Sequence, residues 1–135
     1  MQILAFDYGT KYIGIAVGQT VTKTSSPLMV LNVAQEGKEI WNSISDLLVD
    51  WKPDKILVGK PLNMDGTPSD MMKKVDVFFK KLKKISSVPC ELVDERLTSF
   101  EAKNLVQIYS KAGRVDDLAA KIFLDNWIEN NVHSK

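Results

Sequence analysis

The chain has 135 residues, the length of one domain, and its 44% apolar and 26% charged residues are typical of a globular protein with a sizeable core. A net charge of +1 excludes a strongly basic coat for nucleic acid, although it allows a local basic patch. One cysteine excludes an internal disulfide, and one histidine near the C-terminus argues against a zinc site. No apolar run approaches the ~20 residues that cross a bilayer, and no signal peptide is seen, so a cytoplasmic protein without membrane partners is expected.

The first quarter of the chain reads as strands. Residues 2–7 form a short apolar run that ends at Asp7, and residues 12–18 alternate large and small side chains as a second strand would. The short link between these two segments predicts a hairpin. The polar residues 20–26 are expected to form a loop, and residues 28–33 a third strand.

Helices and strands then alternate. Apolar residues at helical spacing predict a helix over residues 37–51, which Pro53 ends, and a short buried strand follows at residues 55–59. The next segment, residues 60–67, reads as a loop after that strand.

A second helix is expected to begin with Thr67 as its N-cap and Pro68 in its first position. Its exposed faces carry many lysines, which fit a solvated helix face better than a track for a phosphate backbone. Its expected buried stripe is Met71, Val75, Phe78, Leu82 and Ile85, and the lysines are Lys73, Lys74, Lys80, Lys81, Lys83 and Lys84.

The last third is predicted to hold one strand and two helices. Residues 90–94 read as a strand, in which Cys90 is expected to be a small buried core residue. A capping box at residues 98–101 opens a helix that runs to about Lys111. The final helix is predicted over residues 116–129.

Three acidic residues stand at the ends of these elements. Asp7 ends the first strand, Glu95 directly follows the strand at residues 90–94, and Asp116 opens the last helix. In a small α/β domain these ends can meet, and converging carboxylates repel one another unless cations lie between them. The pattern therefore suggests bound Mg²⁺ or Mn²⁺ and the cutting of a phosphodiester bond. No Ser-His or Cys-His pair offers a protein nucleophile.

Each acid also has a simpler interpretation when it is taken alone. Asp7 before a glycine fits a turn, Glu95 fits an ion pair with Arg96 or a lysine, and Asp116 fits an N-cap. Asp117 competes with Asp116 as the third acid. Asp116 shares a helical face with apolar residues, which favours it as the one beside buried surface.

Five further residues are candidates for contacts with substrate phosphates. Thr10 and Lys11 could touch a phosphate, or form a solvated hairpin tip. Asn63 could line the site from the loop after its strand, or serve only as a turn residue. Arg96 and Arg114 flank two of the acids and are the stronger candidates for binding phosphate.

Four segments in chain order resemble the YqgF/RuvX family, and together they span nearly the whole chain. They are Asp7-Tyr8-Gly9-Thr10-Lys11-Tyr12-Ile13-Gly14-Ile15-Ala16-Val17-Gly18, Val58-Gly59-Lys60-Pro61-Leu62-Asn63-Met64-Asp65-Gly66-Thr67, Asp94-Glu95-Arg96-Leu97-Thr98-Ser99-Phe100-Glu101-Ala102 and Val115-Asp116-Asp117-Leu118-Ala119-Ala120. The family comprises ribonuclease H-like proteins described as Holliday junction resolvases and as nucleases that mature the 5′ end of pre-16S ribosomal RNA. Lys11 stands where many members carry arginine, and Lys60 replaces an apolar residue.

The resemblance implies one ribonuclease H-like nuclease domain over residues 1–135, an α/β fold with a mixed sheet flanked by helices. It implies Asp7, Glu95 and Asp116 as catalytic ligands of two Mg²⁺ or Mn²⁺ ions. The implied substrate is structured RNA, namely precursor 16S ribosomal RNA, with the ribosome as a conceivable partner. The protein is expected to be a monomer or a homodimer.

Three other functions compete with this interpretation. A resolvase of DNA four-way junctions would use the same acids, and should present two sites in a symmetric dimer. Asp7-Tyr8-Gly9-Thr10 also resembles the first phosphate segment of actin-like ATPases and sugar kinases, but those need two such domains. A non-catalytic nucleic-acid-binding protein of the same fold would have no use for three buried carboxylates, which cost stability.

Overall fold

The computed structural model describes residues 1–9, 11–33, 37–60, 69–94 and 115–131, and only the backbone of residues 37, 94 and 115–119. Within these residues the chain forms a five-stranded sheet with the strand order β3-β2-β1-β4-β5. β1 pairs with β2, and β2 with β3, in antiparallel fashion, whereas β4 is parallel to both β1 and β5. The strands are β1 (Gln2–Tyr8), β2 (Tyr12–Gln19), β3 (Thr24–Asn32), β4 (Lys55–Lys60) and β5 (Cys90–Asp94).

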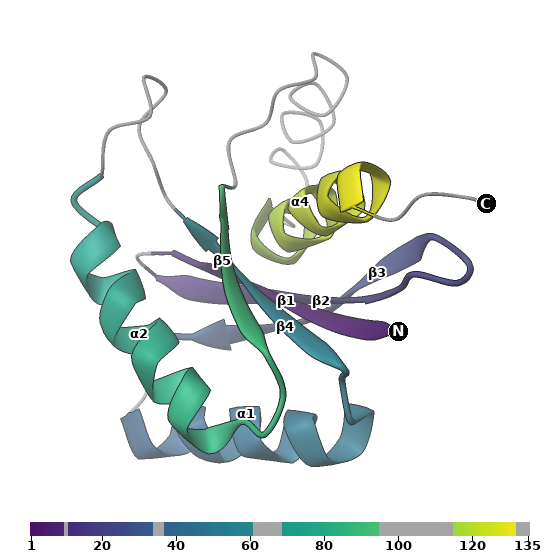
Figure 1. Cartoon of the computed structure of the whole chain (residues 1–135). Coiled ribbons are helices and arrows are strands. Elements are labelled where there is room, and N and C mark those ends of the chain that lie inside the picture. Colours follow the sequence, from purple (N-terminus) through teal and green to yellow (C-terminus); the bar gives the residue numbers. More distant parts are fainter. Residues whose placement is uncertain (10, 34–36, 61–68, 95–114, 132–135) are drawn as a thin grey trace.

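Helices cover both faces of this sheet (Figure 1). α1 (Gly37–Trp51) and α2 (Met72–Ile85) lie on one face, and α4 (Val115–Asn131) lies on the other. The mixed sheet between helices confirms the predicted α/β class, and the predicted hairpin and the bounds of α1 are also confirmed. None of the described helices is long and apolar enough to cross a membrane.

The alternation of side chains along β1 creates two separate cores. Leu4 and Phe6 belong to the core under α1 and α2, whereas Ile3 and Ala5 belong to the core under α4. Successive residues of a strand point to opposite faces of the sheet, so a run that is apolar at every position serves both cores. This explains why residues 3–6 form an uninterrupted buried segment.

Some sequence expectations about β3 and α2 were wrong. β3 begins at Thr24, within the predicted loop, because an edge strand of this sheet tolerates polar side chains while its backbone pairs with β2. α2 begins at Met72 rather than at Thr67 and Pro68, which lie outside the described residues; its N-cap is Met71, after a turn in which the Met72 amide donates to the Ser69 carbonyl. Ile85 is 41% exposed, because it is the last residue of α2.

Cys90 begins β5 and is half-buried rather than fully buried. Burial raises the pKa of its thiol, although a hydrogen bond with Ser86 and the positive charge of Lys83 oppose the shift. The thiol also donates to the Val88 carbonyl at 3.6 Å. Because the folded state holds the thiol proton more tightly, this group contributes stability below its ordinary pKa and loses that contribution as the pH rises.

We expect Cys90 to react slowly with a disulfide reagent at pH 8, because the thiolate is the reacting form and burial disfavours it. The rate should increase severalfold in denaturant, measured by absorbance in the native and unfolded protein. Equal rates in the two states would contradict the assigned environment of the thiol.

Candidate active site

Asp7 is the second-to-last residue of β1, and it lies on the face of the sheet that α4 covers. Ile3 and Ala5, four and two residues earlier, pack under α4, and the alternation of a strand carries Asp7 to the same face. The residue is partly buried and engaged in an interaction within the protein. A carboxylate at the end of a buried strand is held by the sheet, unlike one in a turn.

Gly14 lies directly opposite Asp7 in the β1–β2 hairpin. Paired residues of an antiparallel ladder point to the same face with their Cβ positions about 4.5–5.5 Å apart. Since Gly14 has no side chain, the space beside the Asp7 carboxylate on this face is not filled from β2. The hairpin register therefore assigns Gly14 the role of leaving this space open.

Gly14→Val is expected to lower activity at least tenfold, because two methyl groups would fill the space beside Asp7. The strand should survive, since valine favours β-structure and loses less backbone freedom than glycine on folding. Cleavage rate and thermal midpoint, measured on the same preparation, check both statements.

Ile15→Val is the matched control for that variant. Ile15 neighbours Gly14 on the same strand but is fully buried in the core under α1 and α2. Its truncation should cost about 0.5–1.5 kcal/mol of stability and leave the cleavage rate unchanged. A Gly14→Val protein with full activity would show that this face of the hairpin is not part of the site.

The parallel strands β1, β4 and β5 end at one edge of the sheet. Phe6 is level with Val58, and Lys60 is level with Asp94, the last residue of β5. Figure 1 shows the ends of β4 and β5 on the same side of the molecule as the start of α4. In open α/β sheets this carboxyl edge is where ligands commonly bind.

α4 brings its first turn toward the same edge. Gly18 is level with Ile3, and a Cβ atom built on Gly18 would lie 2.9 Å from Leu124 Cδ2 and 3.1 Å from Ile128 Cδ1. The eight residues from Leu124 back to Asp116 span about 12 Å of helix, and the four from Ile3 to Asp7 span about 13 Å of strand. In Figure 1 α4 runs antiparallel to β1, so the first turn of α4 comes to about the level of the end of β1.

Of the other predicted site residues, the structure describes Lys11 and the backbone of Asp116. Lys11 is exposed at the hairpin turn, where its carbonyl accepts a hydrogen bond from the Val33 amide at 2.8 Å. The structure describes only the backbone of Asp116, and among the residues whose side chains it describes no three Asp, Glu, His or Cys groups gather into a metal cluster. Outside the described residues lie Thr10, Asn63, Glu95, Arg96 and Arg114, as does the helix predicted from the capping box to Lys111.

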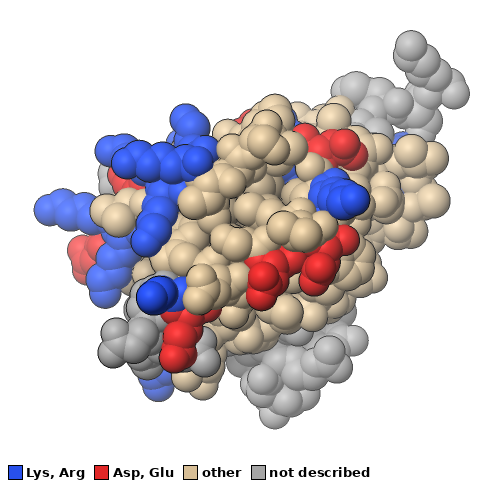
Figure 2. All heavy atoms as spheres, turned by 90° about the horizontal axis from the view of Figure 1, so that it is seen from below, with Lys and Arg blue, Asp and Glu red and all other residues tan. Residues whose placement is uncertain are grey.

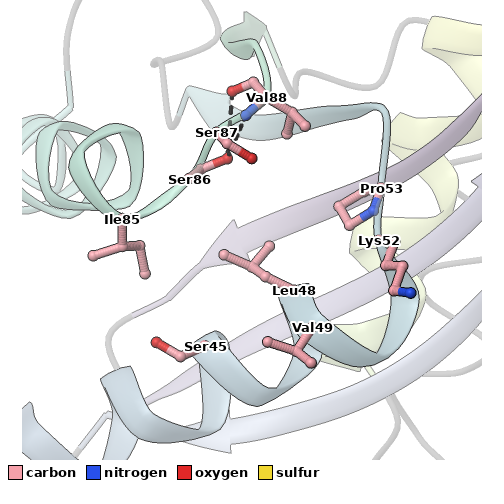
Figure 3. A pocket seen from close by; sticks show the side chains of 9 residues that line it. All are labelled: Ser45, Leu48, Val49, Lys52, Pro53, Ile85, Ser86, Ser87 and Val88. Carbon is pink, nitrogen blue, oxygen red and sulfur yellow. Dashed lines mark hydrogen bonds between the residues drawn. The ribbon is translucent and has the colours of Figure 1, made fainter.

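A cavity of about 380 Å³ lies at the opposite edge of the sheet, between the C-terminal ends of α1 and α2 (Figure 3). Leu48 and Val49 line it from α1, and Ile85 lines it from α2. The hydroxyl of Ser86 accepts from the Val88 amide at its rim, at 3.1 Å. No acidic side chain lines this cavity, so it is separate from the carboxylate edge.

Comparison with known proteins supplies a family and a fold. The family described as "RuvX: Holliday junction resolvase" matches residues 1–130. A Pseudomonas fluorescens (strain SBW25) protein named "Putative pre-16S rRNA nuclease" is 44% identical, over 96% of this chain and 92% of its own length. A protein of the same name from Pasteurella multocida is 42% identical, over 96% of each chain.

Solved structures share the fold at low sequence identity. The RuvC structure of Thermus thermophilus aligns with a TM-score of 0.64 and 15% identity, covering 96% of this chain and 95% of that one. The Fowlpox virus resolvase, solved with Holliday junction DNA, aligns with a TM-score of 0.58 and 17% identity over 98% of this chain and all of that one. These likenesses identify the fold as that of the ribonuclease H-like resolvases.

Proposed function

Because the chain belongs to the RuvX family, we propose that it is a metal-dependent nuclease that processes the 5′ end of precursor 16S ribosomal RNA. It is a hydrolase of phosphodiester bonds, as its family and its relatives indicate. The observation that carries the proposal is the position of Asp7, at a strand end, opposite Gly14 and level with the first turn of α4. The substrate is taken from the name of relatives that are 42–45% identical.

We assign the metal ligands to Asp7, Glu95 and Asp116. Asp7 faces the side of the sheet that α4 covers, β5 ends one residue before Glu95, and Asp116 belongs to the first turn of α4. Carboxylate oxygens are the ligands that Mg²⁺ and Mn²⁺ prefer, and Gly14 leaves room beside Asp7, so these residues fit one or two such ions. Bound there, the metal would supply a hydroxide at neutral pH and stabilise the leaving oxygen.

The protein's own groups orient the substrate in this proposal. The sheet holds Asp7 fixed before any ligand binds, so little reorganisation is needed during the reaction. Lys11 is exposed at the hairpin turn beside Asp7 and can reach a phosphate. We assign the remaining phosphate contacts to Thr10, Asn63, Arg96 and Arg114, of which the arginines can bind two oxygens at once.

The substrate, partners and location follow from this assignment. We propose structured RNA as the substrate, met on or near the assembling ribosome. The relatives are bacterial proteins, and bacterial ribosomal RNA matures in the cytoplasm, which is the location we propose. The residues 1–135 form a single nuclease domain in this account, either as a monomer or as a homodimer.

A second candidate is cleavage of DNA four-way junctions. It is favoured by the family description and by the fold, which this chain shares with resolvases. The same acids would serve, so the chemistry does not separate the two substrates. A resolvase must cut two strands symmetrically and therefore needs two copies of the site in a dimer.

Side-by-side cleavage of precursor 16S ribosomal RNA and of a DNA four-way junction separates these candidates. End-labelled substrates are incubated with Mg²⁺, Mn²⁺ or EDTA. We expect cuts near the 5′ end of the mature RNA that require metal, with the junction intact. Symmetric cuts in the junction alone would overturn the RNA assignment, and cleavage that persists in EDTA would overturn the metal assignment.

A further inference from the structure

Positive charge is concentrated on α2. This helix carries six lysines and one aspartate, Asp76, which gives it a net charge of +5. Since the chain carries +1 in total, the other residues together carry −4. The six lysines are exposed, and none of them forms an ion pair with an acidic side chain that the structure describes. Figure 2 shows the basic side chains gathered on the flank of the molecule where α2 lies.

A pocket of about 310 Å³ adjoins this lysine face. Two of the lysines line it, together with an aromatic cluster contributed by β1, α1 and α2. Ring centroids within the cluster lie 5.1 and 5.2 Å apart, and one lysine Nζ lies 4.9 Å from an indole centroid. The residues used here are Tyr8, Trp41, Lys74, Val77, Phe78 and Lys81.

The rim of the pocket combines apolar surface with charge. Val77 is 69% exposed and stands between Lys74 and Lys81 at helical spacing, so one face of α2 presents charge, apolar surface and charge in order. An exposed valine beside an aromatic pocket is not expected on a helix face that contacts only solvent. The pattern suits a ligand with a flat apolar part and negative charges on either side of it.

An unpaired nucleotide within a strand has this chemistry. Its base can stack on aromatic side chains while the flanking phosphates meet lysines. Bases in a duplex are paired and stacked, so they cannot enter a pocket of this kind. Tyr8 directly follows Asp7 on β1 and points to the opposite face of the sheet, so the pocket and Asp7 lie at the same end of β1.

We propose that the pocket at Trp41 and the lysine face of α2 form an accessory site for a single-stranded segment of the nucleic-acid substrate. One base lies in the pocket against Trp41, and its neighbouring phosphates lie on Lys74 and Lys81. The inference rests on the proposed function for the identity of the ligand. It assigns α2 to substrate binding, with no part in the chemistry at Asp7.

Fluorescence anisotropy of a short labelled oligouridylate tests the site. Binding is measured over a range of salt concentrations, in EDTA and in an Asp7→Asn background, so that no cleavage can occur. Three proteins are compared in that background: the parent, a Lys74→Gln/Lys81→Gln pair, and a Lys23→Gln/Lys52→Gln pair that removes the same charge from residues that do not line the Trp41 pocket. For single strands each lost phosphate contact lowers the slope of log K against log salt by about 0.7.

We expect the α2 pair to lower that slope by about 1.4, and the control pair to leave it unchanged. Trp41→Leu should weaken binding about tenfold at every salt concentration without changing the slope, because stacking is lost and charge is kept. Trp41→Phe keeps a ring and should retain most of the affinity, which covers the case that the leucine variant folds poorly.

Three results would overturn the accessory site. They are an equal loss of slope in both lysine pairs, parental binding by a folded Trp41→Leu protein, and binding of the matching duplex through these residues as tightly as the single strand. The test is independent of the proposed nuclease function. If the expected binding pattern is found but the wild-type protein cuts no RNA, the proposed function is refuted and the accessory site stands. If the wild type cuts RNA with metal but the binding pattern is missing, only the accessory site is refuted.

Discussion

Asp7→Asn is expected to lower the rate of metal-dependent cleavage by at least about 10²–10³-fold, because a preorganised charge at the reacting centre contributes on this order. Asparagine keeps the shape of the side chain, and β1 is held by pairing on both sides, so the fold should persist. Single-turnover cleavage measures the first effect, and a thermal melt the second. If the proposed carboxylates converge, the melting midpoint in the absence of metal should not fall, since the substitution neutralises one of their repelling charges.

Asp50→Asn is the matched control for that substitution. Asp50 is exposed on α1, and the change removes the same charge far from the carboxylate edge. It should leave cleavage within twofold of the wild-type rate. An Asp7→Asn protein that cuts as fast as the Asp50→Asn protein would show that Asp7 is a turn residue and no ligand.

Leu124→Ala is expected to cost about 2–5 kcal/mol of the free energy of unfolding, because Leu124 is fully buried between α4 and the sheet. Activity should also fall, since α4 carries Asp116 and its docking sets the level of its first turn. Urea denaturation measures the first quantity. Val49→Ala on α1 is the control, because Val49 is 68% exposed and its truncation should change stability by less than about 0.5 kcal/mol.

A double-mutant cycle with Gly18 isolates the contact that holds α4. Gly18→Val alone should cost about 1–3 kcal/mol, because its Cβ would lie 2.9 Å from Leu124 Cδ2. In the Leu124→Ala protein that atom is gone, so the valine should cost much less there. Strictly additive losses would contradict the packing of α4 on this end of β2.

The sequence predicted those elements in which the local pattern and the tertiary role agree. α1 has the predicted bounds because its apolar spacing matches the face that packs on the sheet, with Ile40, Ile44 and Leu47 buried. The hairpin of β1 and β2 also follows from short-range pattern. By contrast, β3 starts earlier than its hydrophobicity suggests, because pairing with β2 is a backbone property that polar residues such as Thr24 can share.

The candidate site was predictable one residue at a time but not as an arrangement. Asp7 stands out in the sequence because it is an acidic residue at the end of an apolar strand. Its role depends on the face of the sheet to which its side chain points, and the burial of Ile3 and Ala5 under α4 identifies that face. That Gly14 lies opposite could be found only by counting the hairpin register. The expected start of α2 failed because capping residues also suit a turn that precedes a helix, as at Ser69.

The most direct test of the account is calorimetric titration of Mn²⁺ into the wild-type protein and into Asp7→Asn, Glu95→Gln, Asp116→Asn and Asp117→Asn. We expect saturable binding by the wild type that is weakened at least tenfold in the first three variants and kept in Asp117→Asn. Loss of Mn²⁺ binding in Asp117→Asn with retention of binding in Asp116→Asn would show that Asp117, and not Asp116, is the third ligand. Wild-type affinity in the Asp7→Asn protein would contradict the central claim that this carboxylate holds the metal for phosphodiester hydrolysis.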